Sequence, residues 1–269
     1  MCDLKGKIAS VSGAGQGIGA RTAEVLAEAG AVVVVTDVND ATGEATVARI
    51  RAAGHEAHFQ HLDVTREEDW KSVMNDVCAK SGGLDVLVNN AGVELIKPLA
   101  ELTLDDWHWI CRINLDGVFL GTKYGIRAMT DGSTSRPKGG SIINLSSVAG
   151  LVAGAFQSAY CMTNGGVRLF TKSVAVECAR LKTGVRVNSV HPAVIRTPMW
   201  EGAVSAATAL RVGKDDEETR ALVLSKHPIG RLGEADDVAK AIRYLASDDS
   251  SFVTRGRARR GWGIHGGVK

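Results

Sequence analysis

The sequence predicts a single-domain α/β fold, a doubly wound parallel sheet with helices on both faces. Short β-branched apolar runs alternate with longer segments of helical spacing along most of the 269 residues. The first apolar run is followed by a glycine-rich turn, and the second ends in an aspartate. A strand, a glycine turn, a helix, a second strand and an acid form the dinucleotide-binding unit of a Rossmann-type sheet.

Composition narrows the class of protein. Apolar residues make up 45% of the chain and the net charge is +2, so no strong overall field favours nucleic acid or a membrane surface. Five cysteines are dispersed without a C-x-x-C pair, which is typical of a reducing compartment. The chain enters a strand at once and holds no apolar run of about 18 residues. We therefore expect a soluble cytoplasmic protein without a signal peptide or membrane association.

The first two strands and the glycine turn between them indicate a cofactor site. After a strand at residues 7–11, the turn SGAGQGIG contains Gly13, Gly17 and Gly19, which let a pyrophosphate approach the backbone at a helix N-terminus. The next strand, at 31–35, runs into Asp37, whose carboxylate can accept bonds from ribose hydroxyls and would repel a 2′-phosphate. NAD is thus favoured over NADP. The alternatives are that the glycines form an ordinary tight turn and that Asp37 is a solvated acid at a strand end.

The remaining elements follow from apolar periodicity. Strands are expected at 58–62, 84–88, 142–145 and 185–190, helices at 41–53, 103–129, 160–181 and 234–247, and a polar turn at 131–140.

The candidate catalytic residues follow the strand at 142–145. Ser146 and Ser147 follow that strand directly, and Tyr160 opens the next helical pattern. A hydroxyl at a strand end, with a phenol beside it, can hold a carbonyl or alcohol oxygen by two hydrogen bonds. The phenol could also pass a proton to or from that oxygen.

Several of these motifs resemble the short-chain dehydrogenase/reductase family, in its form of about 250 residues. The spacing of Ser147 and Tyr160, the glycine turn and the segment NNAG at 89–92 are similar to the family's motifs and stand in its order. The resemblance extends over residues 4–254. The active-site motif departs from the family at one position, because Asn164 stands where the family carries a lysine, in the pattern Tyr-x-x-x-Lys.

The resemblance implies a role for each matching residue. Ser147 would orient the substrate oxygen, Tyr160 would act as acid or base, and Asn114 would hold a water in a proton relay, unless it is simply a satisfied core amide. Asn164 could bond a ribose hydroxyl but cannot supply the lysine's positive field. No metal is expected. The implied cofactor contacts are Gly13, Gln16, Gly17, Ile18, Gly19, Asp37, Val38, Asp63, Val64, Asn90, Ala91, Gly92, Tyr160, Asn164, Pro192, Ile195 and Thr197.

Fewer motifs indicate which residues surround the substrate. The family's loop over the nicotinamide would begin at Pro192, with Ala193 in place of the usual glycine, a change that matters only if φ is positive there. Residues 199–225 correspond to the family's mobile lid. An apolar substrate pocket with few polar groups is expected from Trp200 together with Glu94, Leu95 and Ile96. The alternative for 199–212 is a surface helix with a core face.

The chain departs from the family after Thr254. Residues 255–269 are rich in arginine and glycine, whereas family members end in an apolar strand. Codons for residues 255–265 can be chosen so that a shifted reading frame gives Gly-Ala-Glu-Leu-Val-Val-Asp-Gly-Gly-Tyr, which resembles that strand. We therefore place the domain at 1–254 and interpret the tail as a possible frameshift, which would deprive the sheet of the hydrophobic edge strand that family members use in subunit contacts. The alternative is a genuine basic tail that binds nucleic acid weakly.

Together these features predict an oxidoreductase that transfers a hydride between NAD(H) and a secondary alcohol or ketone. The substrate is expected to be bulky and apolar or cyclic. The alternative is a dinucleotide-binding pseudoenzyme that has lost its chemistry through Asn164. The family resemblance implies a homo-oligomer, a tetramer or a dimer. A nucleic-acid partner is not expected.

Overall fold

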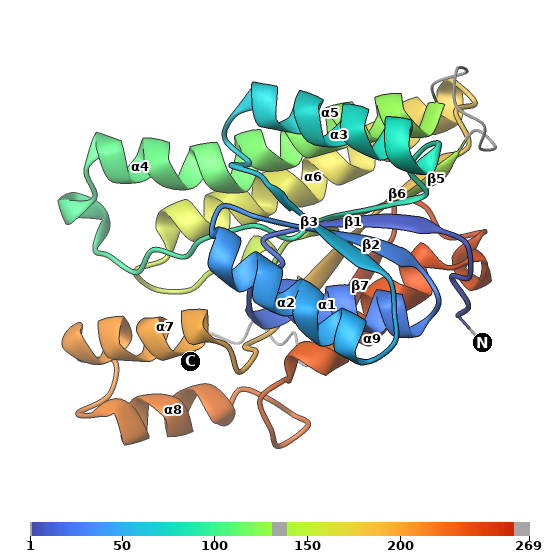
Figure 1. Ribbon diagram of the computed structural model, residues 1–269. Helices are drawn as coiled ribbons and strands as arrows, with labels where there is room; N and C mark the ends of the chain where they lie inside the picture. Colours follow the sequence, from blue (N-terminus) through green and yellow to red (C-terminus); the bar gives the residue numbers. More distant parts are fainter. Residues whose placement is uncertain (1, 131–138, 261–269) are drawn as a thin grey trace.

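A parallel sheet forms the centre of the protein in the computed structural model, which describes residues 2–130 and 139–260 (Figure 1). Its strands lie in the order β3-β2-β1-β4-β5-β6-β7, and every neighbouring pair is parallel. The strands are β1 (Ile8–Ser12), β2 (Val32–Asp37), β3 (Ala57–His61), β4 (Val86–Asn89), β5 (Gly140–Leu145), β6 (Val185–Pro192) and β7 (Arg257–Arg260). This confirms the predicted fold class.

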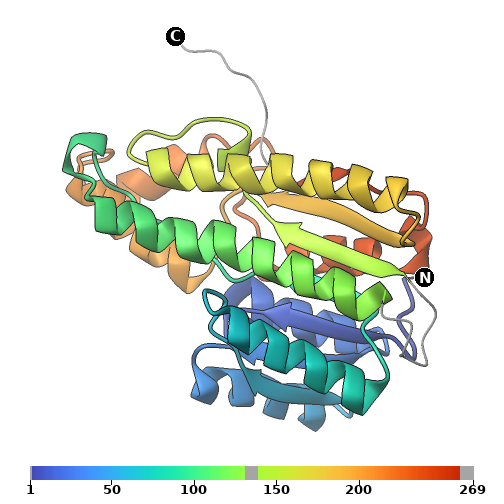
Figure 2. The same cartoon turned by 90° about the horizontal axis from the view of Figure 1, so that it is seen from above.

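Helices cover both faces of the sheet (Figures 1 and 2). The helices are α1 (Gly17–Glu28), α2 (Asp40–Ala52), α3 (Glu67–Ser81), α4 (Leu104–Cys111), α5 (Gly117–Thr130), α6 (Ser158–Arg180), α7 (Pro198–Ala209), α8 (Asp216–Leu224) and α9 (Ala235–Ala246). Apolar side chains of α1, α2 and α9 form one core cluster with the sheet, and those of α3, α5 and α6 form the other. Helices α7 and α8 pack together as a pair outside these two layers.

Strand β2 shows why the sheet needs two cores. Its run Val32–Val35 has no polar face, and alternate side chains of a strand point to opposite sides. Val33 and Val35 enter the core with α1, while Val34 enters the core with α3. A strand that is apolar on both faces is stable only between two helical layers.

The structure differs from the sequence-based expectation along the helix predicted at 103–129. That segment is divided into α4, a π-helical turn at Arg112–Asp116, and α5. The turn contains Asn114, and π-helical turns within α-helices are frequently found at functional sites. Helix α3 was not predicted. The polar turn expected at 131–140 lies mostly outside the described residues.

The sheet continues past the predicted boundary at residue 254. Arg257–Arg260 forms β7 and pairs in parallel with the end of β6, from Ser189 opposite Arg257 to Pro192 opposite Arg260. An edge strand is therefore present here, and its residues are Arg-Ala-Arg-Arg rather than the apolar residues of the family's last strand. The rest of the predicted basic tail, 261–269, lies outside the described residues. No helix in 2–130 or 139–260 is long and apolar enough to cross a membrane.

Candidate active site

A cavity of about 710 Å³ opens where β1, β4, β5 and β6 end. It runs from the glycine turn after β1 to the segment after β5 and the start of α7. The predicted catalytic and cofactor-binding residues all line this one cavity, although they come from distant parts of the chain. The carboxyl ends of parallel strands are where ligands bind in open α/β sheets.

The glycine turn has the backbone that an approaching phosphate requires. Gly13 and Gly17 take left-handed φ angles of 62° and 55°. A Cβ at Gly19 would contact the carbonyl oxygen of Gly13 and the amide of Asn90. That amide donates to the oxygens of Ser12 and Gly13, at 2.9 and 3.0 Å, and holds the turn against the end of β4.

The N-terminus of α1 faces the same cavity. Gln16, at the N-cap position, makes no side-chain capping bond, so its side chain does not satisfy the first N–H groups of the helix. These donors and the positive end of the helix dipole suit an anionic pyrophosphate. The turn and helix therefore fit a dinucleotide, with Gly17, Ile18 and Gly19 in the cavity wall.

Asp37 is held at the end of β2 by the turn itself. Its Oδ2 accepts from the Gly15 N–H at 2.8 Å, and its Oδ1 accepts from the Asn39 N–H at 2.9 Å. A Cβ at Gly15 would contact this carboxylate and Thr42. Gly15 was not among the predicted site residues, although its place within the glycine turn was a signal. The fixed carboxylate retains lone pairs for ribose hydroxyls.

Helix α3 positions the next cavity segment, Asp63 and Val64. The buried Trp70 donates its indole N–H to the Val64 oxygen at 3.0 Å, and Asp69 accepts from the Asp63 N–H at 3.0 Å. The side chain of Asp63 is turned toward Thr65, which donates to it from both its N–H and its hydroxyl.

Asn114 ties the π-helical turn to the chain that leaves β4. Its Oδ1 accepts from the Val93 N–H, and its Nδ2 donates to the Val93 oxygen, both at 2.9 Å. The second Nδ2 proton is directed to the Thr163 hydroxyl at 3.3 Å. Both amide protons are therefore used within the protein. For its side chain, this geometry favours the alternative of a satisfied core amide.

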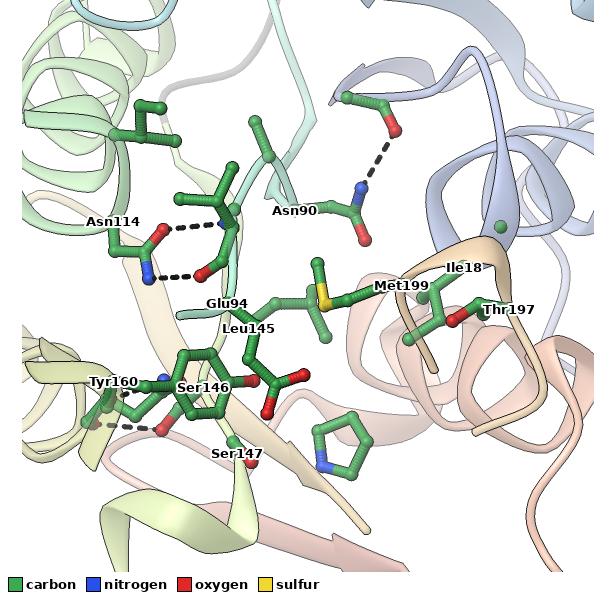
Figure 3. A pocket seen from close by; sticks show the side chains of 18 of the residues that line it. Ile18, Asn90, Glu94, Asn114, Leu145, Ser146, Ser147, Tyr160, Thr197 and Met199 are labelled. Atoms are coloured by element: carbon green, nitrogen blue, oxygen red, sulfur yellow. Dashed lines mark hydrogen bonds between the residues drawn. The ribbon is translucent and has the colours of Figure 1, made fainter. Parts of the chain in front are cut away.

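Ser147 and Tyr160 lie together in the cavity (Figure 3). The Ser147 hydroxyl oxygen accepts from the Ala149 N–H at 3.1 Å, which fixes its position. Burial raises the pKa of the Tyr160 phenol above its usual value, and the nearby Glu94 carboxyl raises it further. Hydrogen bonding with the side chains of Ser147 and Asn164 lowers that pKa, but does not offset the burial. The two hydroxyls thus converge.

The buried His191 supports Ser147 from behind, a contact that was not predicted. Its Nδ1 lies 3.1 Å from the Ser147 carbonyl oxygen and its Nε2 lies 2.8 Å from the Ser189 hydroxyl. Because a carbonyl can only accept, Nδ1 carries the proton and Nε2 accepts from Ser189. The only local signal was a histidine at the end of an apolar strand.

Asn164 lies one helical turn after Tyr160 and is buried. Its side-chain Nδ2 donates to the Tyr160 backbone oxygen at 2.9 Å. The backbone oxygen of Asn164 accepts from the Ser146 hydroxyl at 3.0 Å. The amide is neutral, so this position provides no positive charge to stabilise a phenolate.

The loop after β6 closes over the glycine turn. Ala193 is not among the described residues with positive φ, so its methyl group in place of glycine causes no backbone strain. Ile195 forms a parallel bridge with Gly233. The Thr197 methyl lies 3.4 Å from the position of a Cβ on Gly17, which brings the loop against the phosphate-binding turn.

On the substrate side of the cavity, two polar side chains meet in a wall that is otherwise mostly apolar. Glu94 lines it and accepts a 2.6 Å hydrogen bond from the Gln157 side chain. Leu95 and Ile96, which were expected with Glu94 in the wall, are not among the lining residues. The sequence analysis missed several residues on this side, namely Trp109, Val152, Ala153, Gly154 and Gln157.

The fold and the site together define a dinucleotide-binding oxidoreductase, in which a serine and a tyrosine meet beside a phosphate-binding turn. Residues 13–257 match the family model described as enoyl-(acyl carrier protein) reductase. The chain belongs to the short-chain dehydrogenase/reductase family, which confirms the resemblance noted in the sequence.

Named relatives and solved structures match over nearly the whole chain. The cyclopentanol dehydrogenase of Comamonas sp. (strain NCIMB 9872) is 39% identical over 92% of both chains. The NADP-dependent (R)-specific alcohol dehydrogenase of Lentilactobacillus kefiri is 36% identical over 93% of both. A structure of NAD⁺-bound xylitol dehydrogenase, 29% identical, aligns with a TM-score of 0.90 over 97% of this chain and 99% of that one.

Proposed function

We propose that this enzyme transfers a hydride between NAD(H) and a secondary alcohol or ketone, and that its substrate is cyclic or bulky and apolar. The observation that carries the proposal is the meeting of the Ser147 and Tyr160 hydroxyls in the cavity that begins at the glycine turn. Relatives named for cyclopentanol and for cis-4-hydroxycyclohexanecarboxylate support a ring alcohol.

In this mechanism the hydroxyl of Ser147 donates a hydrogen bond to the substrate oxygen and orients it. Tyr160 donates its proton to that oxygen during ketone reduction and accepts it during alcohol oxidation. The nicotinamide supplies or accepts the hydride when the cofactor is bound. Asn114 acts as a positioning residue, because it anchors the Val93 backbone beside the reacting groups.

NAD is proposed over NADP because of Asp37. Its carboxylate lines the cavity and is fixed by two backbone N–H groups, where it would bond ribose hydroxyls and repel a 2′-phosphate. Asn90 and Gly13 would hold the turn around the pyrophosphate, while Ile195 and Thr197 would face the nicotinamide.

We also propose that turnover is reduced, since Asn164 supplies no positive charge. The comparisons with named dehydrogenases give no support to the alternative of a pseudoenzyme. A nucleic-acid role for the arginine-rich segment is not proposed, because the chain has a net charge of only +2 and no strong overall field that would favour a polyanion. Residues 199–225 would act as the lid, and Met199 and Trp200 already line the cavity.

Self-association is proposed through α5 and α6, as a homotetramer or a dimer. Phe119, Leu169 and Val176 on these helices are 48%, 66% and 51% exposed, and a second copy would remove this apolar area from water. A cytoplasmic location is proposed as well, because the five cysteines are dispersed along the sequence without a C-x-x-C pair.

A frameshift near codon 255 remains our proposal for the end of the chain. The shifted frame would place Glu-Leu-Val-Val at positions 257–260, the four positions that form β7. If the proposal is right, resequencing the gene will show the shifted frame. A chain with that frame restored should also melt at a higher temperature, and an unchanged melting temperature would count against the proposal.

The proposed activity is tested by NAD titration together with a panel of secondary alcohols and ketones. Tyr160→Phe should retain NAD affinity and lose most turnover, because only the phenolic proton donor is removed. Ser147→Ala should also lower turnover. Equal turnover in wild type and Tyr160→Phe would refute the assigned chemistry.

A further inference from the structure

Glu94 places a carboxylate on the substrate side of the cavity, pointing toward the Tyr160 ring (Figure 3). Its Oε1 accepts from Gln157 Nε2 at 2.6 Å. Within the described part of the chain, Glu94 forms no ion pair, and no hydrogen bond reaches its other oxygen, Oε2. Burying a carboxylate is costly unless its oxygens find partners.

The backbone is built to direct Gln157 to this carboxylate. Gln157 is the N-cap residue of α6, yet its side chain makes no capping bond and instead donates to Glu94. The preceding residue, Phe156, takes a left-handed φ of 64°, which is unfavourable for a side chain of this size. Strain of this kind persists only where surrounding contacts impose it.

Contacts between the two loops impose that conformation. The Lys97 N–H donates to the Phe156 oxygen at 2.8 Å, which ties the chain after β4 to the start of α6. The Lys97 ammonium is in turn held by Asp106 at 2.7 Å. The Glu94–Gln157 pair is therefore a rigid feature of the cavity wall, with one carboxylate oxygen left for a ligand.

We infer that Glu94 and Gln157 form a polar subsite for a second hydroxyl of the substrate, next to the carbinol that reacts at Ser147 and Tyr160. The preferred substrate class is then a vicinal diol, or an α-hydroxy ketone in the reverse direction. This inference rests on the proposed function and deepens it.

The chemistry of the subsite selects a hydroxyl. A hydroxyl can donate to Glu94 Oε2, and because it is neutral its binding does not require a charged ligand group to be removed from water. An anionic group would be repelled by the carboxylate, and an ammonium would have to give up part of its hydration to reach it. Because Glu94 points toward Tyr160, a carbinol held at the phenol places its neighbouring carbon close to this carboxylate.

The test compares NAD-linked oxidation of cyclohexanol with that of the 1,2-cyclohexanediols, using the full chain. A hydrogen bond to a charged group predicts that wild type prefers one of the diols by about 10- to 100-fold in kcat/KM. Glu94→Leu should remove this preference, mainly through a higher KM for the diol. Glu94→Gln should restore part of it, and Gln157→Leu should weaken it.

Glu101→Gln serves as the matched control, because Glu101 is an exposed carboxylate outside the cavity and should leave the preference unchanged. NAD binding and melting temperature report whether each variant is folded.

The outcomes separate the two proposals. If cyclohexanol is oxidised but neither diol is preferred, or if Glu94→Leu retains the preference, the subsite is wrong and the proposed function stands. A stronger preference for 2-aminocyclohexanol than for the diols also overturns the subsite. If no alcohol is oxidised at all, the proposed function fails and the inference fails with it.

Discussion

Replacing Asn164 by lysine would introduce an ammonium group beside the phenol of Tyr160. Asn164 is buried, lines the cavity and already contacts the Tyr160 carbonyl through its side chain at 2.9 Å. The longer lysine side chain would extend into the cavity. The fold around it would need little change, because the substitution lies on the wall of an open space.

The magnitude follows from the state of the phenol. A free tyrosine titrates near pH 10, and burial and Glu94 raise the pKa of Tyr160 further, so less than about 1% is ionised at pH 8. A neighbouring cation lowers such a pKa by about 1 to 3, which is equivalent to roughly 1.4–4 kcal/mol. Alcohol oxidation by Asn164→Lys should therefore be about 10- to 1,000-fold faster near neutral pH.

The sign of the pH dependence follows from the same state. The base for alcohol oxidation is the ionised phenol, so the wild-type rate rises with pH toward the raised pKa. In the variant this rise should occur at lower pH. Ketone reduction uses the protonated phenol, so in wild type it should persist across neutral pH and fall only as pH passes the raised pKa.

The assay is the formation of NADH from a secondary alcohol as a function of pH, with NAD affinity measured separately. Asn164→Met is the matched control, since it has a long side chain without charge and should give no gain. If Asn164→Lys binds NAD and folds normally but shows neither a faster rate nor a shifted pH profile, the electrostatic reasoning is refuted.

Three further substitutions test the cofactor and positioning residues. Gly19→Ala would bring a methyl group against the Gly13 oxygen and the Asn90 amide, so NAD should bind at least about 10-fold more weakly by calorimetry, whereas Gly165→Ala, in open space, should not change it. Asp37→Ser removes the carboxylate that would repel a 2′-phosphate, so the preference for NAD over NADP should fall by about 10-fold or more in paired titrations; an unchanged ratio would show that another residue selects the cofactor. Asn114→Ala leaves both backbone groups of Val93 without their partner and should lower the free energy of unfolding by about 1–3 kcal/mol, with kcat reduced more than NAD affinity; equal stability in denaturant would contradict this.

Much of the fold could be predicted because the relevant signals are local. The valine run of β2, the glycine turn and Asp37 lie close together in the chain, and their residue types favour one backbone conformation. The meeting of Ser147 and Tyr160 could also be predicted, since a single strand–loop–helix unit brings them together. Motif spacing therefore identified catalytic and cofactor-binding residues that the fold brings to one cavity.

Other features have no local signal. The π-helical turn around Asn114, the support of Ser147 by His191 and the pairing of β7 with β6 all depend on contacts between distant segments. Apolar periodicity reports which face of an element is buried, but it does not report which distant group lies opposite.

The sequence by itself determined the fold class, the dinucleotide-binding turn and the Ser147–Tyr160 pair, because the alternation of strands and helices, the glycine turn and the strand–loop–helix unit are each local signals. Only the tertiary structure decided the character of the substrate pocket, where Glu94 and Gln157 come from separate elements and meet at 2.6 Å. The physical reason is that a side chain's charge state and hydrogen bonds are set by its neighbours in space, and folding alone brings those neighbours together.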